Sequence, residues 1–152
     1  MGRQEKTRAV EFPPQNFRFC PEAEKTDCPS EDTSVVMRLD EFEAIRLADK
    51  IGYDHAQAAE IMGISRPTFT KLVSRARGKV AELIVDGKPL EISGGSILFS
   101  EDVYCCKICK RPFKRDGEGP LVCPVCSNTN IIKVRSDCNG DCRYCGEDGE
   151  CC

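Results

Sequence analysis

Two cysteine pairs carry the clearest chemical signal in this sequence. Cys106 and Cys109 are separated by two residues, and so are Cys123 and Cys126, thirteen residues further on. Tetrahedral zinc binds four thiolates, and a C-x2-C turn presents two of them at a suitable separation. We predict that these four residues bind one zinc ion, and the same S4 set also suits iron. A redox dithiol would not explain two spaced pairs, and Cys105 is an alternative ligand to Cys106.

The other cysteines are unevenly distributed. Ten of the 12 lie between residues 105 and 152, and residues 35–104 contain none. The C-x3-C-x2-C spacing in the tail resembles the cluster-binding triad of radical enzymes that use S-adenosylmethionine, but such enzymes need a barrel of roughly 200 residues. A second zinc ion or an iron–sulfur cluster remains the metal-binding interpretation, and incidental thiols in an acidic tail are the alternative. The candidate ligands are Cys138, Cys142, Cys145 and either Cys151 or Cys152.

The sequence also indicates in which compartment the protein resides and whether it is an enzyme. Residues 1–10 lack the apolar core of a signal peptide, and no run approaches the ~20 apolar residues of a membrane span. We expect a cytoplasmic protein without membrane association, where thiols stay reduced and dense cysteine pairs are typical of metal ligands. Cys20 and Cys28 lack a local partner pair, so they either complete a metal site or are free thiols. We find no nucleophile–base constellation and no phosphate-binding glycine loop, so we do not expect an enzyme.

Residues 59–72 have the spacing of a helix-turn-helix motif. Gly63 can adopt the positive φ of a tight turn, and the small Ala59 one turn earlier leaves room for the second helix. Ser65 can cap that helix, and a proline is tolerated in its first turn. The same pattern also occurs in ordinary three-helix bundles. The residues expected to close the core between the two helices are Ile64, Phe69 and Leu72.

The second helix of this motif is basic although the net charge of the chain is −3. Residues 65–80 include five basic side chains and no acidic one, whereas residues 137–152 include five acids and one arginine. A helix in the major groove needs cations for phosphates and short polar side chains for base edges. We predict base contacts from Arg66, Thr70 and Lys71, phosphate contacts from Thr68, Arg75 and Arg77, and a place for Ser74 on the same surface.

The periodicity of apolar residues predicts three helices, at about 40–50, 54–62 and 65–85. Asp40 and Asp54 are expected to cap the first two. His55 should face solvent or a phosphate, and the acidic first turn that contains Glu41 and Glu43 should complement the helix dipole. The segment 90–99 reads as a hairpin around its two adjacent glycines.

These elements predict a mainly α fold, in which a three-helix helix-turn-helix domain precedes a small β-rich module. We divide the chain into an irregular N-terminal arm, a helix-turn-helix DNA-binding domain with a short hairpin, a zinc-ribbon-like module and an acidic cysteine-rich tail. Their bounds are 1–34, 35–99, 100–135 and 136–152.

Four blocks closely resemble the domain-of-unknown-function 134 family. They are DEFEAIRLAD, AAEIMGISRPTF, ARGKVAELI and GKPLEISGG, at residues 40–49, 58–69, 76–84 and 87–95. The resemblance covers about residues 10–99 and implies a DNA-binding domain that is winged-helix-like or similar to region 4 of sigma factors. The stretches CKICKRPF and CPVCSNTN resemble the knuckles of a rubredoxin-like zinc ribbon, which implies that Phe113 and the NIIKV segment pack around the metal.

We therefore expect a sequence-specific transcriptional regulator that binds double-stranded DNA, and whose C-terminal metal module stabilises the fold, mediates dimerisation, or senses metal or redox state. RNA polymerase and a second copy of the chain remain open as further partners. The alternative is a metal or iron–sulfur carrier that uses its helical part to dock on other proteins. The basic helix favours the first hypothesis, and the acidic cysteine tail favours the second.

Overall fold

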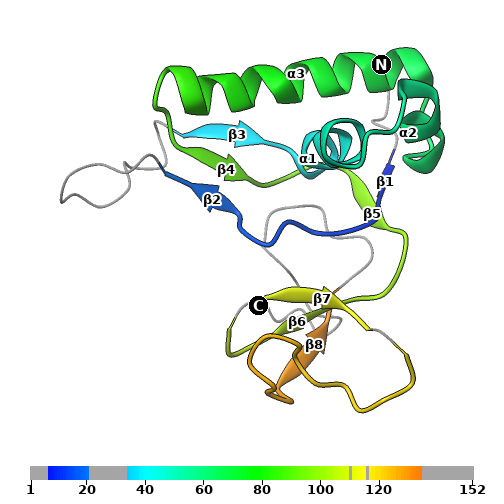
Figure 1. Cartoon of the computed structure of the whole chain (residues 1–152), viewed down its shortest axis with the longest axis vertical. Coiled ribbons are helices and arrows are strands. Elements are labelled where there is room, and N and C mark those ends of the chain that lie inside the picture. Colours follow the sequence, from blue (N-terminus) through cyan, green and yellow to red (C-terminus); the bar gives the residue numbers. More distant parts are fainter. Residues whose placement is uncertain (1–6, 21–33, 110, 116, 135–152) are drawn as a thin grey trace, which may run out of the picture.

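The computed structural model describes residues 7–20, 34–109, 111–115 and 117–134. Within these ranges no helix combines the length and the apolarity needed to cross a membrane. The longest helix, α3, lies over strands β3 and β4, and α1 and α2 pack against it (Figure 1). The helical segments are α1 (Leu39–Ile45), the π-helical η2 (Arg46–Ile51), α2 (His55–Ile61) and α3 (Arg66–Val85).

The two helices α2 and α3 and the turn between them form as predicted. The Asp54 side chain accepts hydrogen bonds from the backbone N–H groups at the start of α2. Gly63 makes the turn with a φ of 64°, and Ser65 Oγ accepts a hydrogen bond from the Thr68 N–H at 3.3 Å. Phe69 and Leu72 are buried between the helices, and Ile64 packs against them. Each local signal in the sequence thus agrees with its neighbours.

The first helix differs from the prediction at its N-terminus. Arg38 is the N-cap, and its backbone N–H donates to Glu41 Oε2 at 2.9 Å. Asp40, the expected cap, lies inside the first turn and is fully buried. Its carboxylate faces the guanidinium groups of Arg8 and Arg38, so it balances buried charge rather than closing the helix end.

The strands of the N-terminal part form two small sheets. β1 and β5 pair in parallel, and β4 lies between β2 and β3. Part of the segment expected to be irregular therefore forms strands. The strands are β1 (Arg8–Val10), β2 (Arg18–Phe19), β3 (Val35–Met37), β4 (Leu90–Ile92) and β5 (Ile97–Phe99).

The predicted hairpin at residues 90–99 is wrong. Its two strands, β4 and β5, belong to different sheets. The connecting loop makes other bonds: the Gly94 carbonyl accepts from the Leu39 N–H, and the Ser96 carbonyl accepts from the Arg8 N–H, both at 3.0 Å. Gly94 and Gly95 do have positive φ, 73° and 110°, but this freedom serves a crossing between sheets rather than a two-residue turn.

A third sheet lies beside the two cysteine pairs, of which only Cys106 is on a strand. Its central strand is paired antiparallel on both sides, in the order β7-β6-β8. With eight strands in the described ranges the fold is mixed α and β, and the expected mainly α class is not confirmed. Strands of two to four residues are too short for alternation to distinguish them from loops. The strands of this sheet are β6 (Val103–Cys106), β7 (Pro112–Lys114) and β8 (Ile131–Lys133).

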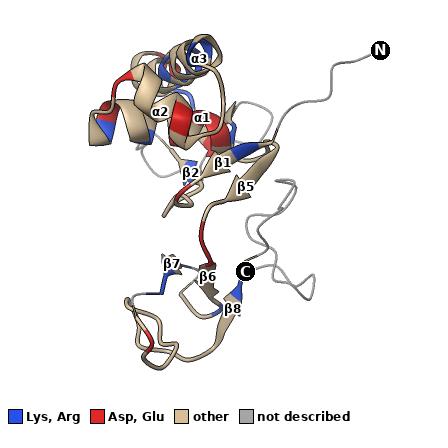
Figure 2. Cartoon of the chain, turned by 90° about the vertical axis from the view of Figure 1, so that its right-hand side faces the viewer, with Lys and Arg blue, Asp and Glu red and all other residues tan. Residues whose placement is uncertain are grey.

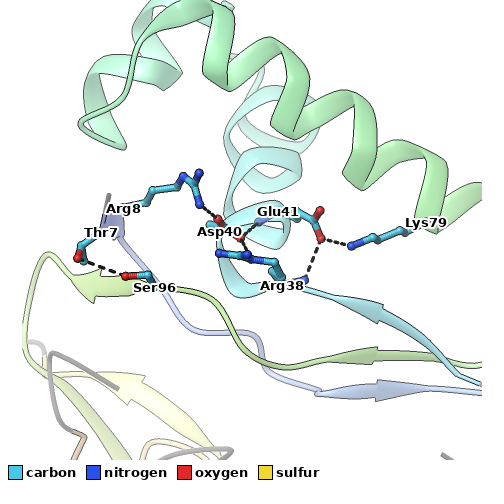
Figure 3. Close-up of polar contacts among 7 residues, drawn as sticks. All are labelled: Thr7, Arg8, Arg38, Asp40, Glu41, Lys79 and Ser96. Atoms are coloured by element: carbon cyan, nitrogen blue, oxygen red, sulfur yellow. Dashed lines mark hydrogen bonds and ion pairs between the residues drawn. The ribbon is translucent and has the colours of Figure 1, made fainter. Parts of the chain in front are cut away.

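Three carboxylates on α1 are buried together with their cationic partners. Asp40, Glu41 and Glu43 are 0%, 2% and 0% exposed. Figure 2 shows acidic positions on α1 and basic positions on α3, and Figure 3 shows Asp40 facing Arg8 and Glu41 facing Lys79. Glu43 pairs with Arg46 and also accepts the Glu11 N–H at 3.0 Å. The partners come from β1, the N-cap of α1, η2 and α3. This cluster, which we call the α1 carboxylate cluster, therefore joins α1 to elements far away in sequence, β1 and α3. Its partners are Arg8, Arg38, Arg46 and Lys79.

We predict that Lys79→Met lowers the free energy of unfolding by about 2–3 kcal/mol, because it leaves the Glu41 carboxylate buried without its cation. Lys88→Met is the matched control, since its pair with Glu82 is exposed on both sides and should contribute less than about 1 kcal/mol. Denaturant unfolding of both variants measures the difference. Equal losses would contradict the assigned role of the Glu41–Lys79 pair.

Candidate functional site

The four cysteines of the predicted zinc site come together beside the third sheet, where Cys106 is the last residue of β6 and the other three lie outside the strands. Their sulfur atoms all lie within 4.8 Å of one another. The Cys106–Cys126 and Cys109–Cys123 sulfur pairs are each 3.6 Å apart. A tetrahedral Zn–S bond of about 2.3 Å implies sulfur separations of about 3.8 Å. The four thiols can therefore hold a metal ion such as zinc.

The backbone around the cysteines stabilises thiolates. Burial raises the pKa of Cys123, but the N–H groups of Cys126 and Val125 donate to its sulfur and the net effect lowers its pKa to about 7. The first cysteine of the other pair behaves alike: burial opposes ionisation of Cys106, but two donated N–H groups lower its pKa. The backbone thus favours ionisation of the first sulfur of each knuckle, and a metal ligand must be ionised.

The second cysteine of each pair, Cys109 or Cys126, has a raised pKa instead. The Asn128 N–H lowers the pKa of Cys126, but desolvation and the three neighbouring thiols outweigh it and raise the pKa to about 12. Desolvation, the largest influence on Cys109, raises its pKa as well. Four thiolates this close repel one another, so full ionisation needs a cation among them.

The strand β6 separates Cys105 from the cluster. Neighbouring residues of a strand point to opposite faces: Cys106 packs with Phe113 and Cys123, whereas Cys105 is buried in the core of the N-terminal part. Phe113 stacks on Tyr104 at 6.1 Å, and Ile131 of the NIIKV segment packs beside the cluster, as expected. Cys105 therefore does not replace Cys106.

The remaining cysteines give a mixed outcome. Cys20 and Cys105 each take part in a disulfide, so the expectation of reduced thiols is not met at these two positions. The proposed second metal site cannot be placed, because its ligands lie outside the described residues, as does Cys28. Those ligands are Cys138, Cys142, Cys145, Cys151 and Cys152.

The predicted DNA-contacting residues lie along the outer surface of α3. Six of them are exposed, and Thr68 is half-buried. The Thr68 hydroxyl lies 2.7 Å from Ser65 Oγ. Lys71 and Arg75 form no ion pair within the described part of the chain. We call this set the α3 basic face. Its exposed members are Arg66, Thr70, Lys71, Ser74, Arg75 and Arg77.

Arg77 differs from the other cations of the α3 basic face. Its guanidinium forms two hydrogen bonds to the Asp49 carboxylate of η2, at 2.7 and 3.1 Å. This contact raises the pKa of Arg77 and lowers that of Asp49. A phosphate would have to compete with Asp49, so Arg77 is a weaker candidate contact than Arg75.

One contact at this surface was not foreseen. His55 Nδ1 lies 3.0 Å from Thr70 Oγ1, and its ring stands edge-on to Phe69 with centroids 5.4 Å apart. From the sequence we expected His55 to contact only solvent or a phosphate. His55 and Thr70 are fifteen residues apart and lie on opposite sides of the turn. The pair therefore lacks the i to i+4 spacing by which contacts within one helix can be found in a sequence.

Comparison with known proteins places the chain in a family. The model of the protein of unknown function DUF134 family matches residues 1–100. The UPF0251 protein of Methanothermobacter thermautotrophicus is 37% identical over 137 residues, covering 90% of this chain and 70% of that protein. The UPF0251 protein of Syntrophobacter fumaroxidans is 34% identical over 156 residues, covering 100% and 96%.

The match to the Syntrophobacter fumaroxidans protein spans the whole of this chain and therefore extends beyond residue 100, where the family model ends. The UPF0251 protein of Chloroherpeton thalassium is 44% identical over 101 residues, 66% of this chain and 67% of that protein. No solved structure matches the chain significantly. The chain belongs to the DUF134 (UPF0251) family.

Proposed function

We propose that this protein binds double-stranded DNA in a sequence-specific manner and regulates transcription in the cytoplasm. The observation that carries the proposal is the α3 basic face, which follows a capped turn and lies opposite the buried side of the same helix. In helix-turn-helix proteins the second helix enters the major groove and the first crosses the backbone. In this arrangement α3 would read the bases and α2 would lie near the phosphates.

The side chains of the α3 basic face suggest separate roles. Lys71 is a mobile point charge near the start of the helix, where base edges are contacted. Arg75 lies one turn later and suits a phosphate, and Arg66 begins the helix.

We propose zinc as the metal of the four-cysteine site. Zinc would link the two knuckles covalently to one centre and stabilise a module that has few buried apolar residues of its own. The chain's own contribution is a set of backbone N–H groups that lower the pKa of Cys106 and Cys123 and so favour their thiolate forms. No catalytic role is proposed for the site.

A metal carrier is the second candidate function. Cys126 is exposed, so a thiol of an acceptor protein could reach the metal and displace this ligand. The carrier hypothesis predicts fast transfer of metal to such an acceptor and only weak, sequence-independent DNA binding. A regulator with structural zinc would instead retain its metal during DNA binding.

For DNA binding we predict that Arg75→Ala weakens binding to all sequences about equally and reduces the slope of log K against log salt by about 1, because one phosphate contact is lost. Lys71→Ala should weaken binding to the preferred site by about 1–3 kcal/mol and relax preference at one base pair. Affinity titrations at several salt concentrations measure both. Lys88→Ala is the control, because Lys88 lies beyond the C-terminal end of α3. This variant should leave the affinity for DNA unchanged.

The assignment of Lys71 and Arg75 would be contradicted if both variants kept the affinity and salt dependence of the unchanged protein. Loss of folding is checked by comparing their unfolding midpoints with that of Lys88→Ala. Both target residues are exposed, so all three midpoints should agree.

For the metal site we predict that Cys106→Ala removes one equivalent of tightly bound metal per chain, because three thiolates and water bind zinc more weakly than four thiolates. Val125→Ala is the control, because its exposed side chain lies between Cys123 and Cys126 and its removal leaves all four thiols in place, so this variant should retain the metal. Metal analysis after dialysis measures the stoichiometry. Retention of the metal by Cys106→Ala, or an equal loss in Val125→Ala, would contradict the assigned ligand set.

A further inference from the structure

His55 is held by two residues of α3 where the two helices of the motif meet. Its Nδ1 atom lies 3.0 Å from Thr70 Oγ1. Its ring packs edge-to-face on the buried Phe69, with an angle of 64° between the ring planes. The imidazole is half-buried and is the one histidine of the chain. Aromatic packing and the hydrogen bond together fix its orientation.

The direction of the His55–Thr70 hydrogen bond follows from a second bond. The Thr70 hydroxyl donates to the Arg66 carbonyl oxygen at 3.1 Å. A threonine hydroxyl has one hydrogen and two lone pairs. Since that hydrogen is engaged by Arg66, the hydroxyl accepts from His55, whose Nδ1 carries the proton. The neutral Nδ1–H tautomer and the imidazolium both donate from this nitrogen, so the direction is the same in either state.

These two bonds leave Thr70 with one lone pair and no hydrogen to give. In the major groove the adenine N6 and cytosine N4 amines donate, whereas guanine O6 and N7 and thymine O4 accept. A hydroxyl in this state can form a hydrogen bond only with the donors. Thr70 is exposed on the α3 basic face, so this restriction applies where bases would be read.

We propose that His55 is a positioning residue that determines base specificity, because it fixes Thr70 as a hydrogen-bond acceptor for an exocyclic base amine. The inference rests on the DNA-binding function proposed above. It goes beyond that function by naming the atom type that one side chain reads. It also gives α2 a part in specificity through a residue that acts on α3.

The test uses the metal-loaded, full-length protein and the duplex that it selects from a random pool. Each adenine of the selected site is replaced in turn by purine, and each cytosine by 2-pyrimidinone, so that one exocyclic amine is removed at a time. Affinities are measured for the unchanged protein, Thr70→Val, His55→Ala and His55→Gln. Thr70→Val keeps the shape of the side chain and removes the hydroxyl.

We expect one amine removal to weaken binding by the unchanged protein about 3- to 10-fold more than binding by Thr70→Val, as for a single neutral hydrogen bond. His55→Ala should reduce this difference to less than about 2-fold, because only the bond to the Arg66 carbonyl then opposes rotation of the hydroxyl towards an acceptor on a base. His55→Gln should restore it, since an amide N–H can replace the imidazole donor. A role of His55 in packing alone would not be rescued by glutamine.

Two results would overturn the inference while leaving DNA binding intact. In one, the affinity lost on removal of the amine still depends on the Thr70 hydroxyl to the full extent when His55 is replaced by alanine. In the other, replacing a purine by its 7-deaza form, which removes an acceptor atom instead of a donor, weakens binding by the unchanged protein more than binding by Thr70→Val. Failure of the unchanged protein to select any sequence would overturn the proposed function, and this inference with it.

Discussion

The α1 carboxylate cluster is the interaction on which the rest of the N-terminal fold depends. An ionised carboxylate is costly to bury unless it is paired and hydrogen-bonded. Asp40 and Glu41 can be buried only where Arg8 of β1 and Lys79 of α3 reach them. The cluster therefore fixes α3 relative to α1 and β1. Since α2 packs on α3 as well, the placement of the helix-turn-helix motif follows from this charge pairing as much as from apolar burial.

The strand β6 links the cysteine cluster to this core. On one face Cys105 and Val103 are buried with Val10 and Ala76, and on the other Cys106 belongs to the four-thiol cluster. A further contact joins the N-terminal segment to the same sheet, where Gln15 Nε2 donates to the Pro112 carbonyl at 3.2 Å. The candidate metal centre thus shares a strand with the core that supports α3. This arrangement gives a metal a physical route to influence the proposed DNA-binding surface.

Sequence reasoning succeeded where each feature depends on nearby residues. The turn at Gly63, the caps at Asp54 and Ser65, and the two C-x2-C knuckles all follow from local spacing. It failed where pairing is distant: β4 and β5 looked like a hairpin but find partners elsewhere, and Asp40 looked like a cap but is neutralised by Arg8, 32 residues away. The His55–Thr70 contact was missed for the same reason, because it requires knowing how α2 and α3 pack.

The most direct test of DNA recognition by α3 is to map backbone amide chemical shifts of the metal-loaded protein as its selected duplex is added. We predict that the largest changes occur in residues 65–77 and at the start of α2, with smaller changes around the four cysteines. Changes confined to residues 105–127, or no saturable changes at all, would contradict the account and favour a metal-binding protein whose helices contact other proteins.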